Sequence, residues 1–197
     1  MRQFHPGAVL QTAVLLFMAF SANAAAMPDS TQSDGLSLFN RAVQCFNSTD
    51  YRTALKIFAN VDTEGNNSFV RYYLGACSYQ IGDYKGAMKY LSAVAVEDSL
   101  YPFASFYQAE TMIALHNPGA ALEFLSRSLC RDSAYAPARL EYIRTLCAVD
   151  SFQAAEQFVG RQCREDEALT LSKELVGAKK FDDAYPFLVL VVTRDST

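Results

Sequence analysis

The 197-residue sequence contains no tryptophan and only two histidines, one of which, His5, lies near the amino terminus. The other, His116, lies in a polar His-Asn-Pro-Gly turn. A nucleophilic site that uses histidine as its base would need a cysteine or serine within hydrogen-bond reach of that one turn. Glycine-rich phosphate loops and recognisable carboxylate pairs are also missing. We therefore expect a protein that is not an enzyme and needs no cofactor.

The five cysteines also lack the spacing that metal sites require. They include no Cys-x-x-Cys pair, and they lie at Cys45, Cys77, Cys130, Cys147 and Cys163. Structural zinc sites usually take two ligands from one short turn. We expect no metal site.

An excess of positive charge is missing as well. The chain has 17 Lys and Arg against 21 Asp and Glu, a formal net charge of −4 at pH 7. Proteins that bind nucleic acid usually carry a basic stripe. We therefore do not expect nucleic acid among the partners.

The amino-terminal segment, over positions 1–26, has the pattern of a secretory signal peptide. A single positive charge, Arg2, precedes an apolar run over positions 8–20 and the small-residue segment SANAAA. An uncleaved anchor is the alternative, but about thirteen apolar residues are short of the roughly 20 that span a bilayer. The next segment, 27–34 (MPDSTQSD), is polar and predicts a short linker. We expect a periplasmic or secreted protein without a membrane span after cleavage.

The segment Tyr72 to Leu91 (YYLGACSYQIGDYKGAMKYL) has the pattern of two helices joined by a tight turn. Gly75 and Ala87 have almost no side chain, so the helices can cross closely there. Leu74 and Leu91 are placed to fill the space around the crossing. Gly82 and the following Asp mark the turn and the start of the second helix.

The same pattern recurs along the chain. An alanine follows each expected turn, at Ala54, Ala87, Ala121, Ala155 and Ala184. Four positions after each alanine comes a large apolar residue on the same helix face, at Phe58, Leu91, Leu125, Val159 and Leu188. The spacing and the pattern resemble the tetratricopeptide repeat (TPR), a helix-turn-helix of about 34 residues, although the last interval is shorter. The departures from that pattern are Arg41, Gln108, Pro118 and Ile143.

The resemblance implies an all-α protein, a right-handed α-solenoid of about five helix-turn-helix repeats over positions 35–197. The repeats would cover about 35–67, 68–101, 102–135, 136–164 and 165–197. The expected helices run about 36–47, 51–61, 69–81, 84–96, 102–115, 118–130, 136–149, 152–163, 167–178 and 182–192.

The resemblance also implies a function. In TPR proteins the first helix of each repeat lines a concave groove that binds peptides or partner proteins. The matching positions here are Phe39, Val43, Phe46, Phe69, Tyr72, Tyr79, Phe103, Phe106, Glu110 and Arg144. Rigid rings on such a face serve as binding anchors, or they pack as core; both interpretations stay open. We expect a protein–protein interaction scaffold in the cell envelope that holds its partner on the concave face.

The carboxyl-terminal run FLVLVV at 187–192 is unusual, because the end of a solenoid is normally polar. It would pair with another molecule, fold as a strand, or continue into a missing domain. The alternative function is therefore a structural assembly subunit that docks, to a copy of itself or to a downstream domain, through Leu188, Leu190 and Val191.

Repeat register leaves two interpretations of the cysteines. Cys45 and Cys77 would lie at similar heights on neighbouring first helices, and Cys130 and Cys163 on neighbouring second helices. In an exported protein these could form disulfides. The alternative is that the cysteines are buried thiols that act as small apolar residues.

Overall fold

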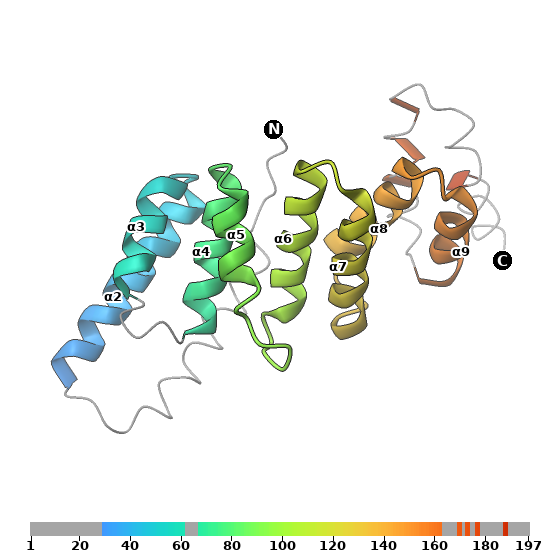
Figure 1. The fold of residues 1–197 in the computed structure, drawn as a ribbon. Helices are drawn as coiled ribbons and strands as arrows, with labels where there is room; N and C mark the ends of the chain where they lie inside the picture. The colour runs from blue at the N-terminus through green and yellow to red at the C-terminus, as the bar shows by residue number, and fades with distance from the viewer. Residues whose placement is uncertain are drawn as a thin grey trace. The chain divides into compact units, whose positions relative to one another are not determined.

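The computed structural model describes residues 29–61 and 67–162, with the short pieces 169–170, 172–173, 176–177 and 187–188. Within these residues all regular secondary structure is helical, and there is no strand (Figure 1). The chain divides into two compact units, 1–65 and 66–197, which are described in turn. The expected signal peptide, and most of the expected fifth repeat, lie outside the described residues.

The described residues of the first unit form one helix pair, α2 (Asp29–Asn47) and α3 (Tyr51–Val61). The pair is closed by aromatic packing: the ring centroids of Phe39 and Phe58 lie 5.6 Å apart, and those of Phe46 and Tyr51 lie 5.3 Å apart. The prediction of a linker over 27–34 is wrong for positions 29–34, because α2 already begins at Asp29. The helix therefore extends further towards the amino terminus than its apolar pattern indicated.

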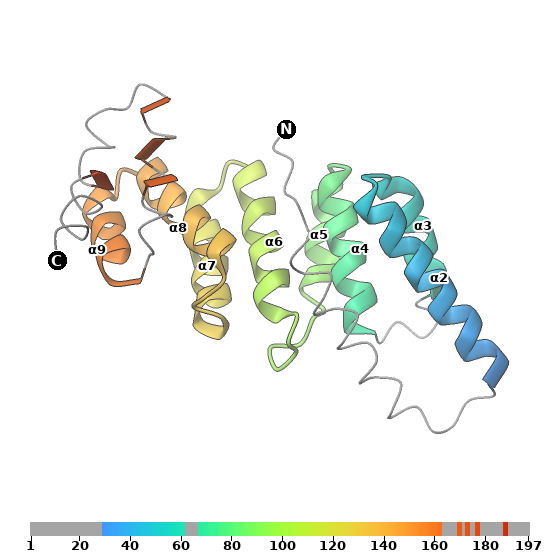
Figure 2. The same ribbon diagram turned by 180° about the vertical axis from the view of Figure 1, so that it is seen from behind.

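Over positions 67–162, the second unit forms three consecutive helix pairs (Figures 1 and 2). They are α4 (Ser68–Gln80) with α5 (Tyr84–Leu91), α6 (Tyr101–Ala114) with α7 (Pro118–Arg131), and α8 (Ala136–Ala148) with α9 (Phe152–Gln162). Each helix packs on the next along the chain, and the first helices α4 and α6 also pack on each other. The helices and their repeating order confirm an all-α helical repeat solenoid.

The small residue after each turn is fully buried, as the repeat pattern predicts. Ala54, Ala87, Ala121 and Ala155 have no exposed surface. The apolar residues one helical turn later, Phe58, Leu91, Leu125 and Val159, are at most 1% exposed. Gly75 is required for the same reason: a Cβ there would lie 2.5 Å from Cγ of Leu91 on α5. The fifth alanine, Ala184, lies outside the described residues.

The turns inside the helix pairs share one backbone conformation. The residue that ends the first-helix side of each turn has a positive φ, at Thr49 (63°), Gly82 (84°), His116 (58°) and Asp150 (56°). These positions recur with the period of the helix pairs, so the turn belongs to the repeat. His116 is exposed and occupies this turn position.

The next residue in three of these turns caps the second helix. The side chain of Asp83 accepts a 2.9 Å hydrogen bond from the Gly86 amide, and that of Asn117 accepts one of 3.2 Å from the Ala120 amide. Asp50 accepts in the same way from the amide of Thr53. Each cap satisfies a backbone N–H at the start of its helix.

Helix α5 ends at Leu91, well before the expected position 96. Arginines from neighbouring helices bond the carbonyl groups that follow. Arg71 on α4 donates to the Ala93 carbonyl at 2.8 Å, and Arg131 on α7 donates to the Val96 carbonyl through Nε at 3.1 Å. The carbonyls are thus satisfied outside a helix. The hydrophobic periodicity of α5 could not predict its early end, because the arginine donors are distant in the sequence.

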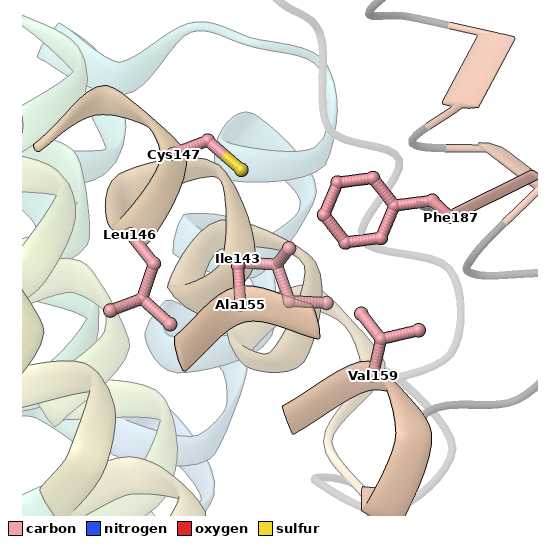
Figure 3. Packing of buried hydrophobic residues seen from close by; sticks show 6 residues of the cluster. All are labelled: Ile143, Leu146, Cys147, Ala155, Val159 and Phe187. Atoms are coloured by element: carbon pink, nitrogen blue, oxygen red, sulfur yellow. The ribbon is translucent and has the colours of Figure 1, made fainter. Parts of the chain in front are cut away.

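The last described residues are Phe187 and Leu188, near the carboxyl-terminal end of the second unit. Phe187 is 1% exposed and packs in one core cluster with Ile143, Leu146, Cys147, Ala155 and Val159. In Figure 3 its ring points toward the side chains of α8 and α9. Leu188 is 37% exposed, whereas Leu190 and Val191 lie outside the described residues. In the part of the chain described, no helix has the length and apolar character needed to cross a membrane.

Candidate functional site: an aromatic surface on α4 and α6

In the first unit the expected groove rings are part of the core. Phe39 and Phe46 are each 6% exposed and pack against α3 through the ring contacts given above. Val43, between them on α2, is partly exposed. Of the two interpretations of these rings, packing therefore accounts for Phe39 and Phe46.

In the second unit the expected residues separate into two levels. Tyr72 and Phe106 are 6% and 4% exposed and belong to the core. The remaining expected residues are partly exposed, namely Phe69, Tyr79, Phe103, Glu110 and Arg144. The expected site in this unit is thus partly buried and partly accessible.

Edge-to-face ring contacts join the two levels. Tyr72 contacts Phe103 and Tyr107, with centroids 6.5 Å and 5.8 Å apart, and Tyr107 contacts Tyr79 at 5.7 Å. Tyr135, which directly precedes α8, contacts Phe103 at 4.9 Å and Phe106 at 5.5 Å. Such pairs add stability beyond the burial of their area. We call the partly exposed set, Tyr79, Phe103, Tyr107, Glu110 and Tyr135, the α4–α6 aromatic surface.

One carboxylate lies within this surface. The Tyr79 hydroxyl donates a 2.9 Å hydrogen bond to Oε2 of Glu110. Burial, and then the negative charge of Glu110, raise the pKa of Tyr79 well above its ordinary value. Burial, followed by Tyr107 and Glu110, raises the pKa of Tyr135 in the same direction. Both hydroxyls are protonated at neutral pH, and that of Tyr79 is committed to Glu110.

Tyr107 and Tyr135 were not predicted from the sequence. The groove positions implied by the TPR resemblance include neither, because Tyr107 follows a groove position and Tyr135 precedes its helix. A signal for Tyr107 was present, since Phe103, Phe106 and Tyr107 follow the i, i+3, i+4 spacing of one helix face. Tyr135 reaches the surface from the α7–α8 connection, which helical periodicity does not cover.

Arg144, the most carboxyl-terminal of the expected groove residues, is held on its own helix. Its Nη1 donates a 2.9 Å hydrogen bond to Oε2 of Glu141, one helical turn earlier on α8. The two side chains are 19% and 13% exposed, so the pair is largely shielded from water.

Next to the aromatic surface lies an open hollow of about 300 Å³. Phe103 belongs to both. The hollow is lined by Glu97, Asp98, Ser99, Pro102, Phe103, Arg131 and Asp132. Three carboxylates thus face one guanidinium, and that guanidinium bonds the Val96 carbonyl. The balance of charge in the hollow is negative.

The cysteines do not form a reactive centre in the part of the chain that the structure describes. Cys45, Cys77 and Cys130 are free thiols in the structure. The pairing of Cys45 with Cys77, which would join the two units, and that of Cys130 with Cys163, which lies outside the described residues, both stay predictions. Burial raises the pKa of the Cys77 thiol to about 12, which keeps it protonated at neutral pH. The described part of the chain also contains no group of three or more His, Cys, Asp or Glu residues that could hold a metal ion.

Comparison with known proteins identifies the fold. No protein-family model and no curated protein matches the sequence. Among solved structures, MamA from Desulfovibrio magneticus RS-1 is similar with a TM-score of 0.62 and 16% identity, over 87% of this chain and 98% of that one. A thermophilic TPR protein of Thermus thermophilus, TTC0263, gives 0.60 and 16%, over 81% and 90%. YrrB, a TPR protein with an unusual peptide-binding site, gives 0.57 and 15%, over 84% and 88%. The chain therefore has a TPR-like fold.

Proposed function

We propose that this chain is an exported protein-interaction module that holds a peptide or partner protein on its α4–α6 aromatic surface. The observation that carries the proposal is a set of partly exposed rings supported by the buried rings of Tyr72 and Phe106. Rings held by packing lose little conformational entropy when a partner covers them, and aromatic residues dominate binding hot spots. The likeness to YrrB, a TPR protein with a peptide-binding site, supports the same kind of role.

The role is binding without chemistry. His116 is an exposed residue in a turn of positive φ, and the buried Cys77 is protonated at neutral pH, so neither supports a nucleophilic site. The polar groups of the aromatic surface are tyrosine hydroxyls and one carboxylate, which accepts a hydrogen bond from Tyr79. These groups suit hydrogen bonding to a partner.

Docking through the carboxyl-terminal end is less well supported than binding on this surface. Phe187, the first residue of the apolar run, is buried by packing on α8 and α9. Leu188 is left 37% exposed. Leu190 and Val191 lie outside the described residues, so docking through this end stays a prediction.

The proposed export rests on the pattern of positions 1–26, with Arg2, an apolar run and a small-residue segment. We place the protein in the periplasm or outside the cell. The test is amino-terminal sequencing of the protein isolated from the source organism. A chain that begins after Ala24 or Ala26 supports export, and a chain that begins at Met1 in the cytoplasmic fraction contradicts it.

Affinity capture tests binding on the surface. The processed protein, meaning the chain after signal-peptide cleavage, is compared with two variants. One is the Phe103→Ala, Tyr107→Ala double variant, and the other is Tyr90→Ala on α5, which serves as a control. Circular dichroism first establishes that all three keep their helicity. We expect a partner that is retained by the wild type and by Tyr90→Ala and lost by the double variant. Equal capture by all three proteins would contradict the proposal.

A further inference from the structure

We propose that the partner segment bound on the α4–α6 aromatic surface carries a basic side chain, lysine or arginine, that pairs with Glu110. This inference rests on the function proposed above and adds the chemistry of the partner. It follows from three features: the carboxylate within the rings, the rings themselves, and the charge of the neighbouring hollow.

The first feature is the position of Glu110. Its Oε2 accepts a 2.9 Å hydrogen bond from the Tyr79 hydroxyl, and its side chain is only partly exposed. A partner that lies over this surface removes water from the carboxylate. Covering a charged carboxylate costs free energy, and an incoming lysine or arginine with good hydrogen-bond geometry offsets that cost. A carboxylate on the partner would instead be repelled.

The second feature is the set of rings beside that carboxylate. Tyr79 and Tyr107 lie with ring centroids 5.7 Å apart, and Glu110 is among the groups that raise the pKa of Tyr135. The faces of tyrosine rings attract cations, and more strongly when water is excluded. The aliphatic stem of lysine or arginine also packs well on aromatic surface. Rings and carboxylate therefore favour the same kind of side chain.

The third feature is the hollow at the other end of the surface. Glu97, Asp98 and Asp132 line it against the single charge of Arg131, and Phe103 connects it to the rings. A basic segment would therefore meet carboxylates both at Glu110 and in the hollow, whereas an acidic one would meet like charges at these two places. Complementary charge of this kind selects the partner and speeds its association.

A random peptide library displayed on phage tests the inference. The bait is the processed protein in three forms: wild type, Glu110→Gln and Glu123→Gln. Glutamine at position 110 keeps an acceptor for the Tyr79 hydroxyl and removes only the charge. Glu123 on α7 is the matched control, because its side chain is 73% exposed and the charge change is the same.

We expect lysine and arginine to be enriched in peptides selected by the wild type and by Glu123→Gln, and not in those selected by Glu110→Gln. Measured by fluorescence anisotropy, a selected basic peptide should bind Glu110→Gln about tenfold more weakly, in line with the loss of one charge-assisted contact. Binding to the wild type should also weaken as salt is added.

The other outcomes separate the two proposals. Selected peptides that need Phe103 and Tyr107 but show no excess of basic residues, or that bind Glu110→Gln equally well, would overturn this inference and leave the proposed function standing. If no selected peptide is weakened by the Phe103→Ala, Tyr107→Ala double variant, the proposed function fails and this inference fails with it.

Discussion

The hydroxyl of Tyr79 on α4 donates a 2.9 Å hydrogen bond to Oε2 of Glu110 on α6, 31 residues further along the chain. The bond joins the first helices of two successive pairs at the aromatic surface. It also fixes the position of the one carboxylate among the rings. The same contact therefore contributes to the packing of the repeats and to the proposed recognition of a partner.

Removing that hydroxyl should destabilise the protein. We expect Tyr79→Phe to lower the free energy of unfolding by about 1 kcal/mol, because the bond has a charged acceptor but is only partly shielded from water. Chemical denaturation measures the change. Tyr90→Phe, on α5, removes a hydroxyl from the second helix of the same pair and should cost less than about 0.5 kcal/mol. Equal losses in the two variants would contradict a structural role for the bond.

Alkaline pH should destabilise the second unit through its buried tyrosines. Burial, and to a smaller extent the neighbouring Cys77, raise the pKa of Tyr73 from 10.0 to about 12. The unfolded chain releases this proton near pH 10 and the folded chain holds it, so the contribution is complete below pH 10 and lost as pH rises through 12. We expect the thermal midpoint to fall across that window, and to fall less in Tyr73→Phe. An unchanged midpoint between pH 10 and 12 would contradict the burial of Tyr73.

The close crossing of α4 and α5 predicts a strong effect of adding one methyl group. Gly75→Ala places Cβ 2.5 Å from Cγ and 2.7 Å from Cδ2 of Leu91. Overpacking of this kind costs about 1 to 3 kcal/mol. In Gly119→Ala, the matched change in α7, the nearest outside atom is Oδ1 of Asn117 at 3.9 Å, so the effect should be neutral or slightly stabilising. Denaturation midpoints of the two variants compare these outcomes directly.

The carboxyl-terminal apolar run gives the fourth prediction. Phe187 is 1% exposed within the cluster of α8 and α9, and Leu188 beside it is 37% exposed. Truncating a buried phenylalanine costs about 3 to 5 kcal/mol, so Phe187→Ala should markedly destabilise this end of the unit. Leu188→Ala should have little effect. Hydrogen exchange of the α8 and α9 amides reports the change, and a small effect of Phe187→Ala would show that the run serves another purpose.

Most of the fold could be predicted from the sequence, because each helix pair has a recognisable local pattern. A small residue where the helices cross, an apolar residue one turn later and a polar break between them are local features that recur at a regular interval. The burial of Ala54, Ala87, Ala121 and Ala155 confirms this pattern. Gln108 and Ile143 depart from the TPR pattern, yet both side chains are buried in the second unit. The repeat therefore packs in the same way at these positions.

The site was harder to predict from the sequence, because the solvent exposure of a side chain depends on its neighbours in the next repeat. Phe103 and Phe106 stand on neighbouring turns of α6, yet Phe106 is buried and Phe103 is partly exposed. Tyr135 joins the rings from a connection between helices. The early end of α5 has the same origin, because Arg131 reaches the Val96 carbonyl from 35 residues away.

Photo-crosslinking in cells of the source organism tests the central proposal most directly. A photoreactive phenylalanine analogue is placed at position 107 on the α4–α6 aromatic surface, and in separate proteins at position 123 on α7 and at position 188. Binding on the aromatic surface predicts a crosslinked partner from position 107 and none from the other two. Crosslinks from position 188 or 123 without any from position 107 would contradict it and move the interaction elsewhere on the protein.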